Sequence, residues 1–171
     1  MTAYAAMLRA VNVGGTAKLP SAELKAMGEA CGFEEVRTFI ASGNLLFATD
    51  QSENAVRKAI EDKVEARFGR AVPVLVRTAA ELAEVVSRNP FADRPGNRVV
   101  ALFVDDTPTR SMLDAARHVA NEELALGPRA LYIAYDEGMG SSKLTLPAQK
   151  TGTARNMNSV AKMASLLAEM E

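Results

Sequence analysis

The amino-acid sequence predicts an α+β protein made of duplicated ferredoxin-like βαββαβ units with antiparallel sheets and a C-terminal helix. The first observation is that β-rich segments and segments of helical spacing follow one another in the order βαββαβ over residues 1–78. The second is that the order begins again after a connecting helix at residues 79–88. We therefore expect an N-terminal unit, residues 1–78, and a second unit, residues 79–171, that includes the connecting and terminal helices.

Capping residues mark the helices of the first half. Pro20 suits the first turn of a helix and Ser21 is a good N-cap, so we expect a helix to open there. Ser52 opens a second helix, and Gly32 and Gly69 stop the two helices. The strands expected in this half cover residues 4–8, 36–41, 45–48 and 72–76, with a hairpin turn at Gly43-Asn44.

The second half repeats the pattern with weaker signals. Its expected strands cover residues 99–104, 122–126, 130–135 and 153–155. Helices are expected over residues 109–117 and 142–149, although Pro147 weakens the second of them. A terminal helix begins at Asn156 or Asn158.

Composition and charge exclude several classes of function. The chain of 171 residues has a formal net charge of -1, which argues against duplex DNA as a binding partner. Its single cysteine, Cys31, allows no intramolecular disulfide. The N-terminal segment does not resemble a signal peptide, and the longest apolar run, residues 99–104, is too short to cross a bilayer. We expect a cytoplasmic protein with no membrane partner; the sequence identifies neither a cofactor nor an oligomeric state.

Few residues suit metal binding or catalysis. One histidine and one cysteine leave no Cys/His zinc site, so no metal site is predicted. His118 lies near the end of a polar helix, where we expect a solvated side chain rather than a catalytic one. Asp105 and Asp106 end a strand, where paired carboxylates can hold magnesium, but they are also ordinary turn formers.

Antiparallel topology predicts one ligand-binding cluster in the first half. The first βα loop and the hairpin share one end of the sheet, and the helix start at Ser21 favours an anion there. Glycines would let the backbone approach a ligand closely, although they are also what ordinary turns use. The residues predicted to converge are Arg9, Asn12, Gly14, Gly15, Ser42, Gly43 and Asn44.

The same topology predicts a second cluster in the other half. A glycine-rich loop over residues 138–143 and the end of the last strand are expected at one end of the second sheet. Two helix starts, hydroxyl groups and two basic residues would then suit a phosphate or carboxylate. A capped, solvated corner is the alternative, and the two clusters form either one site or two. The residues of this cluster are Ser142, Lys143, Thr153, Arg155 and Asn156.

Four segments of the chain form a distinctive set of motifs. They are Leu-Arg-Ala-Val-Asn-Val-Gly-Gly (8–15), Lys-Leu-Pro-Ser-x-x-Leu (18–24), Thr-Phe-Ile-Ala-Ser-Gly-Asn-Leu-Leu-Phe (38–47) and Thr-Ala-Arg-Asn (153–156). Together they resemble the bacterial domain-of-unknown-function 1697 family. The resemblance implies a duplicated ferredoxin-like fold and implies no activity. Met157 stands where the family usually has Trp, which argues against aromatic stacking on a ligand there.

Three functions follow from these features. The first is binding of a small anionic metabolite or nucleotide through the Gly-rich basic loops. The second is an enzyme acting on a phosphorylated substrate, with Arg9, Lys143 and Arg155 holding charge, but no general base is obvious. The third is binding of single-stranded RNA. Tyr4 and Phe47 are available to stack on bases, yet aromatic residues make up only 5% of the chain.

Overall fold

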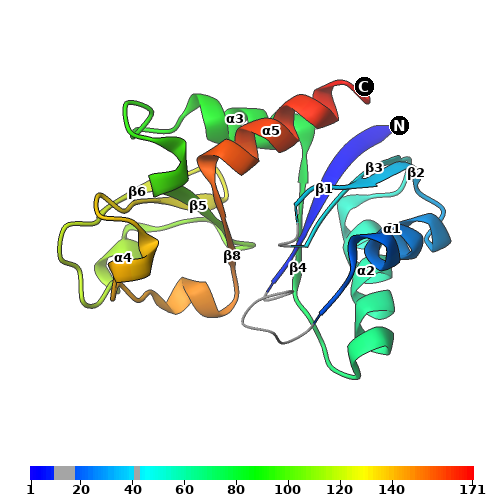
Figure 1. Ribbon diagram of the computed structural model, residues 1–171, viewed down its shortest axis with the longest axis horizontal. Coiled ribbons are helices and arrows are strands. Elements are labelled where there is room, and N and C mark those ends of the chain that lie inside the picture. The colour runs from blue at the N-terminus through cyan, green and yellow to red at the C-terminus, as the bar shows by residue number, and fades with distance from the viewer. Residues whose placement is uncertain (10–17, 41–42) are drawn as a thin grey trace. The chain divides into compact units, whose positions relative to one another are not determined.

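The computed structural model describes residues 1–9, 18–40 and 43–171. It has mixed helix and strand content, with two four-stranded antiparallel sheets and a C-terminal helix (Figure 1). These features of the predicted fold are confirmed. The chain divides into two compact units: unit 1 comprises Met1–Ala80 with Met163–Glu171, and unit 2 comprises Glu81–Lys162. In sequence, unit 2 therefore interrupts unit 1.

Unit 1 contains one sheet and two complete helices. Its strands are β1 (Thr2–Leu8), β2 (Glu34–Thr38), β3 (Asn44–Thr49) and β4 (Val74–Thr78); its helices are α1 (Ser21–Ala30) and α2 (Glu53–Phe68), and α3 (Ala79–Ser87) leads into unit 2. The strand order is β2-β3-β1-β4, and all neighbours are antiparallel. β1 and β3 are thus the inner strands, which agrees with their almost continuous burial.

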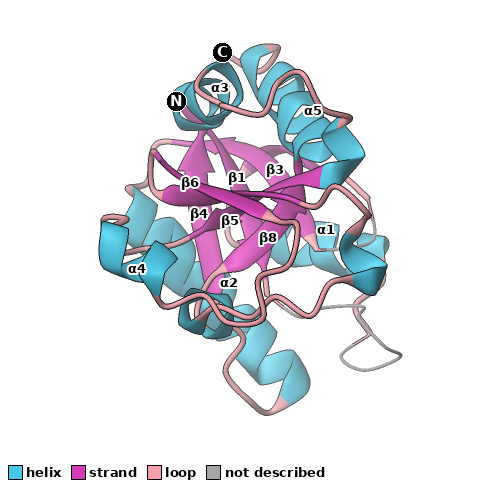
Figure 2. Ribbon diagram, turned by 90° about the vertical axis from the view of Figure 1, so that its left-hand side faces the viewer, coloured by secondary structure: helices cyan, strands magenta, loops and turns pink. Residues whose placement is uncertain are grey.

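The core of unit 1 is formed by side chains of this sheet and of helices α1 and α2. Figure 1 shows both helices on the same side of the sheet, and Figure 2 distinguishes the helices from the strands by colour. Leu8 and Phe47 of the inner strands are buried together with Val56 and Ile60 of α2. The ring of Phe33 stacks on that of Phe47, with 4.1 Å between centroids. Burying one such side chain stabilises the fold by roughly 1.5–3 kcal/mol, so this cluster holds sheet and helices together.

Local capping signals explain the bounds of α2 but not those of α1. Ser52 Oγ accepts a hydrogen bond from Ala55 N at 3.2 Å, and Gly69 ends α2 in the left-handed conformation with φ of 72°. In α1 the N-cap is Pro20, and no side chain caps the helix. The interpretation of Ser21 as the N-cap was wrong, because Ser21 is already the first helical residue.

Unit 2 is built around the second sheet. Its strands are β5 (Val99–Phe103), β6 (Glu123–Gly127), β7 (Ala130–Ala134) and β8 (Thr153–Asn156), and short 3₁₀ turns cover Gly96–Arg98, Met139–Ser141 and Pro147–Lys150. The unit also contains α4 (Arg110–Asp114), most of α3 and the first half of α5 (Met157–Ala168). The strand order is β6-β7-β5-β8, again antiparallel throughout. α5 follows β8 directly and returns to unit 1 at Met163.

The helix predicted over residues 142–149 does not form. Leu144 and Leu146 are buried and Thr145 between them is exposed, an alternation that belongs to extended chain. Leu146 has extended dihedral angles, as expected for a residue that precedes a proline. The helix predicted over residues 109–117 is shorter than expected, since α4 has only five residues.

No helix in the described part of the chain, residues 1–9, 18–40 and 43–171, combines the length and the apolar character that crossing a membrane requires.

Candidate functional site

The end of β1 lies between the hairpin and the start of β4. Leu8 N donates a hydrogen bond to Gly43 O at 2.9 Å, and Arg9 N donates to Pro73 O at 3.0 Å. The structure therefore brings Arg9 and Gly43 to the same end of the first sheet. Of the other residues predicted for this cluster, Asn12, Gly14, Gly15 and Ser42 lie outside the described residues.

Asn44 braces the hairpin. Its side chain is buried, and its Nδ2 donates to Phe39 O at 3.0 Å, while Phe39 N donates to Asn44 O at 3.1 Å. Gly43, with φ of 86°, supplies the left-handed backbone that the turn requires. Ile40 has φ of 52°, which is unusual for a β-branched residue. Phe39 and Asn44 are thus tied to each other, and Gly43 is hydrogen-bonded to Leu8, the residue before Arg9.

Arg155 is a buried cation in β8. Only 7% of it is exposed, and its Nη1 donates to Thr153 Oγ1 at 2.8 Å and to Ala154 O at 2.9 Å. Burial lowers the pKa of Arg155 to about 10, because the charged form loses solvation. Asn156 Oδ1 accepts a hydrogen bond from Ser159 N at 2.9 Å and so caps α5.

Ser142 and Lys143 lie elsewhere in unit 2. They line a hollow of about 170 Å³ together with His118, Glu122 and Glu137. We call this the Glu122 hollow. Arg155 is not among the residues that line it. The structure therefore gives Lys143 and Arg155 different surroundings, although both were predicted at one end of the second sheet.

The Glu122 hollow lies between two segments of chain that are joined by backbone contacts on either side of it. Arg117 and Thr145 exchange two backbone hydrogen bonds, of 2.9 and 3.0 Å, at one end. At the other end, Glu123 of β6 pairs with Ala134 of β7. Between these two ties, the walls of the hollow come from residues 118–122 and 137–143. Backbone contacts consequently tie the two segments together beyond each end of the hollow, while the described residues of the walls between these ties are not paired by backbone hydrogen bonds of a strand ladder.

Glu122 is the buried charge of the hollow. It is 6% exposed, and its carboxylate oxygens lie 3.1 and 3.4 Å from Ala120 N, which donates to them. The charge of Glu122 acts on the neighbouring Tyr135. The pKa of the Tyr135 phenol is raised mainly by burial and, to a smaller extent, by the negative charge of Glu122. His118 adds an exposed imidazole on a backbone with φ of 59°. Acidic, basic and hydrogen-bonding groups are therefore combined in one small space.

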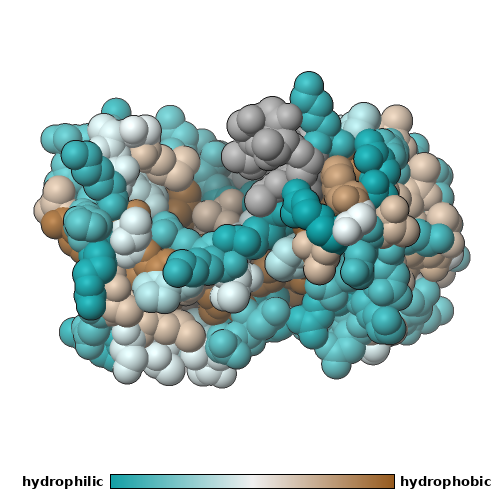
Figure 3. Space-filling model, turned by 90° about the horizontal axis from the view of Figure 1, so that it is seen from below, coloured by the Kyte–Doolittle hydropathy of each residue, from teal (hydrophilic) through white to brown (hydrophobic). Residues whose placement is uncertain are grey.

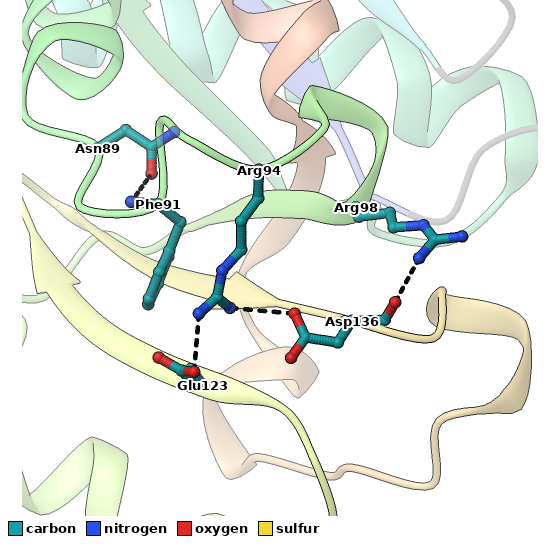
Figure 4. Close-up of polar contacts among 6 residues, drawn as sticks. All are labelled: Asn89, Phe91, Arg94, Arg98, Glu123 and Asp136. Atoms are coloured by element: carbon teal, nitrogen blue, oxygen red, sulfur yellow. Dashed lines mark hydrogen bonds and ion pairs between the residues drawn. The ribbon is translucent and has the colours of Figure 1, made fainter.

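Arg94 and Arg98 contact Glu123 and Asp136, which are the sequence neighbours of Glu122 and Glu137 in the lining of the hollow (Figure 4). Arg94 contacts Glu123 through Nη2 at 2.7 Å and Asp136 through Nη1 at 3.2 Å. The guanidinium carbon lies 4.9 Å from the ring centroid of Phe91. The hydrogen bond to Glu123 is the main reason that the pKa of Arg94 is raised. In addition, Arg98 Nη1 donates to Asp136 O, and Tyr135 N donates to Arg98 O at 2.7 Å.

A family model described as "Protein of unknown function (DUF1697)" matches residues 1–132. This chain belongs to the DUF1697 family. The resemblance inferred from the four sequence segments is thereby confirmed. No curated protein matches the chain.

One solved structure is similar over nearly the whole DUF1697 chain. It is that of the conserved bacterial protein SP0830 from Streptococcus pneumoniae, with a TM-score of 0.80 and 21% sequence identity. The match covers 97% of this chain and 98% of that chain. At this identity the comparison shows a shared fold.

Sequence reasoning about this DUF1697 protein missed two residues of the site. Glu122 was expected at the start of the strand over residues 122–126, and Arg94 was not among the predicted site residues. A carboxylate at the first position of an expected strand was the available signal for Glu122. Arg94 gave no local signal, because its two partners lie 29 and 42 residues away in sequence. Among the described residues, no group of three or more His, Cys, Asp and Glu side chains is arranged to hold a metal ion.

Proposed function

We propose that this DUF1697 protein binds a small metabolite with an anionic group in the Glu122 hollow. The observation that carries the proposal is that Lys143 and the buried Glu122 line one small opening. Lys143 would pair with a carboxylate or phosphate of the ligand. Glu122, which is an acceptor when ionised, would receive a hydroxyl or ammonium group. The ligand class is therefore a small hydroxy acid, amino acid or phosphate ester.

The size of the hollow favours a small metabolite over a nucleotide. Its volume of about 170 Å³ lies below the range of roughly 300–1,000 Å³ that is typical of sites for drug-sized ligands. The side chains that line the hollow are mainly polar, so a polar ligand fits it better than an apolar one does. Hydrophilic side chains also cover much of the face of the molecule shown in Figure 3.

The end of the first sheet is a second candidate position for an anion. The backbone of Arg9 donates there to Pro73 O, just before β4, and its neighbour Leu8 donates to Gly43 O. A guanidinium group beside a glycine turn suits a phosphate or carboxylate, because the glycine leaves room for close approach. Binding at this position is tested by Arg9→Lys, which keeps the charge and removes the planar fork. Weaker phosphate binding at an unchanged melting temperature is expected, and unchanged binding would reject this position.

We also propose that the two units are duplicated ferredoxin-like units. The strand orders β2-β3-β1-β4 and β6-β7-β5-β8 correspond strand for strand, which supports a duplication. Each last strand, β4 or β8, also leads directly into a helix, α3 or α5. In unit 2 the chain between β7 and β8 has short 3₁₀ turns where unit 1 has α2.

His118 provides a direct test of ligand binding. It is the single histidine of the chain and lines the Glu122 hollow, so its imidazole signals in an NMR spectrum report on this site. We expect a saturable shift of these signals on titration with at least one of three probes: inorganic phosphate, lactate and serine. Lys143→Gln should weaken that binding, whereas Lys150→Gln, an exposed lysine outside the hollow, should not. Signals that move with none of the probes, or equal losses in the two variants, would reject the proposal.

A further inference from the structure

We propose that Arg94 is a positioning residue that sets the separation between the two walls of the Glu122 hollow. The inference rests on the proposed function, because the hollow is taken as the ligand site. Arg94 binds Glu123 and Asp136, which are the direct sequence neighbours of Glu122 and Glu137. One guanidinium group thus contacts both walls. On each wall, the residue that it contacts is the direct sequence neighbour of a glutamate that lines the hollow.

On the first wall, strand geometry explains how Arg94 acts on Glu122. Glu123 begins β6, and successive side chains of extended chain point to opposite sides. Glu123 reaches Arg94 on one side, while Glu122 is buried in the hollow on the other. A shift of Glu123 would accordingly rotate or displace Glu122.

On the second wall, Arg94 acts on a turn. Gly138 N donates to Tyr135 O at 3.0 Å, so Asp136 and Glu137 are the central residues of the turn that this bond closes. Figure 4 shows the carboxylate of Asp136 directed at Arg94 and its backbone oxygen at Arg98. Arg94 and Arg98 thereby hold the turn through Asp136, and the position of Glu137 in the same turn depends on these contacts.

The contact of Arg94 with Glu123 and Asp136 also balances negative charge on the two walls. Glu122, Glu123, Asp136 and Glu137 place four carboxylates on two short segments, and Arg94 pairs with two of them. Without Arg94, repulsion between the walls would favour a wider opening. The side chain of Arg94 is also pre-placed, because it lies over Phe91, whose backbone N donates to Asn89 Oδ1 at 2.9 Å. Its planar fork presents donors to two carboxylates in fixed directions, whereas the ammonium of lysine has no such fixed geometry.

The test compares Arg94→Met, Arg94→Lys and a control in the full chain. Glu81→Gln is the control, because it removes the ion pair of Glu81 with Arg129 at 2.8 Å, also in unit 2 and of similar exposure. The first readout is the His118 imidazole signal without any ligand, recorded about two pH units above the ordinary histidine pKa of roughly 6.5. We expect Arg94→Met and Arg94→Lys to shift this signal and Glu81→Gln to leave it in place.

The second readout is the affinity for inorganic phosphate. We expect Arg94→Met to weaken it by about tenfold and Arg94→Lys to restore it only in part. An unshifted His118 signal in folded Arg94→Met protein, or full restoration by lysine, would overturn the positioning role. If the wild-type protein does not bind phosphate, the function fails for this probe, while the ligand-free signal still decides the positioning role. Should Arg94→Met not fold, Asp136→Ala removes one of the two carboxylates that Arg94 contacts, and a shift of the His118 signal is again expected.

Discussion

Arg77 and Arg155 occupy equivalent positions in the two sheets. Arg77 of β4 is the cross-strand neighbour of Ala5 in β1, and Arg155 of β8 is the neighbour of Ala101 in β5. Both are buried, with 1% and 7% exposed. Burying a guanidinium group costs free energy, so the same choice at the same place in both sheets points to a role besides stability.

Replacement of Arg155 by Met is expected to leave the protein at least as stable as before. The methionine removes a buried charge, and this gain offsets the loss of hydrogen bonds to Thr153 and Ala154. Thr153→Val should instead destabilise by roughly 1–3 kcal/mol, because it removes an acceptor while the buried guanidinium remains. Denaturant unfolding of both variants checks this order. A larger loss in Arg155→Met than in Thr153→Val would contradict it.

Gly152→Ala is expected to destabilise unit 2 by about 1–3 kcal/mol or more. A Cβ atom at Gly152 would collide with the backbone oxygen of Phe103 and lie 3.1 Å from that of Ala148. Backbone atoms cannot move aside as a side-chain end can. Gly140→Ala is the matched control, because a Cβ atom there meets nothing within 4 Å. Equal melting temperatures for the two variants would contradict the close approach at Gly152.

Ser52→Ala should destabilise the protein by about 1 kcal/mol through its effect on α2. The hydroxyl of Ser52 accepts from Ala55 N, and alanine leaves that N–H without its acceptor. Ser52→Asp restores an acceptor at the helix start and should recover most of the loss. Urea unfolding of the three proteins measures the effect, and an aspartate variant no better than alanine would rule out the capping explanation.

Tyr132 should make the protein sensitive to alkaline pH. Burial raises the pKa of Tyr132 from 10.0 to about 12, so the folded state favours the protonated phenol. This contribution to stability is full below the unfolded pKa and is lost as pH rises through the folded one, roughly between 10 and 12. Tyr132→Phe removes the hydrogen bond to Val85 O, of 2.6 Å, and should cost about 1 kcal/mol near neutral pH. Its unfolding free energy should fall less steeply over the alkaline range, and an identical slope would contradict the assignment.

Glu122→Gln should lower the pKa of Tyr135. The phenol of Tyr135 is kept protonated first by burial and second by the charge of Glu122, and glutamine removes only the second cause. NMR titration of the Tyr135 ring signals measures the change. The Lys143→Gln variant removes a charge of opposite sign from the same hollow and should not lower this pKa. If Glu122→Gln leaves the titration of Tyr135 unchanged, Glu122 does not face it.

Local signals were sufficient for most of the secondary structure. The Ser52 cap and the Gly69 stop predicted α2, because both act on the nearest turn of the helix. The same reasoning failed over residues 142–149, where burial of Leu144 and Leu146 in the core favours extended chain. Such tertiary packing outweighs the weak helix propensity of a segment that contains proline.

The candidate site was only partly predictable for a similar reason. Ser142 and Lys143 were recognised from their glycine-rich loop, and the structure places them in the Glu122 hollow. Their proposed partner Glu122 comes from a segment some twenty residues earlier, across the bridge between Arg117 and Thr145. Pairing of this kind depends on the register of non-local contacts, which one sequence without relatives does not reveal.

The interrupted course of unit 1 has a consequence for the order of folding during synthesis. Residues 163–171 belong to unit 1 but are translated after the whole of unit 2. Ala3 N, at the start of β1, donates a hydrogen bond to Glu171 Oε2 at 3.2 Å across a separation of 168 residues. On the ribosome, unit 2 can therefore fold while unit 1 still lacks its final segment. A nascent chain released before that segment would leave unit 1 incomplete and more open to proteolysis and aggregation.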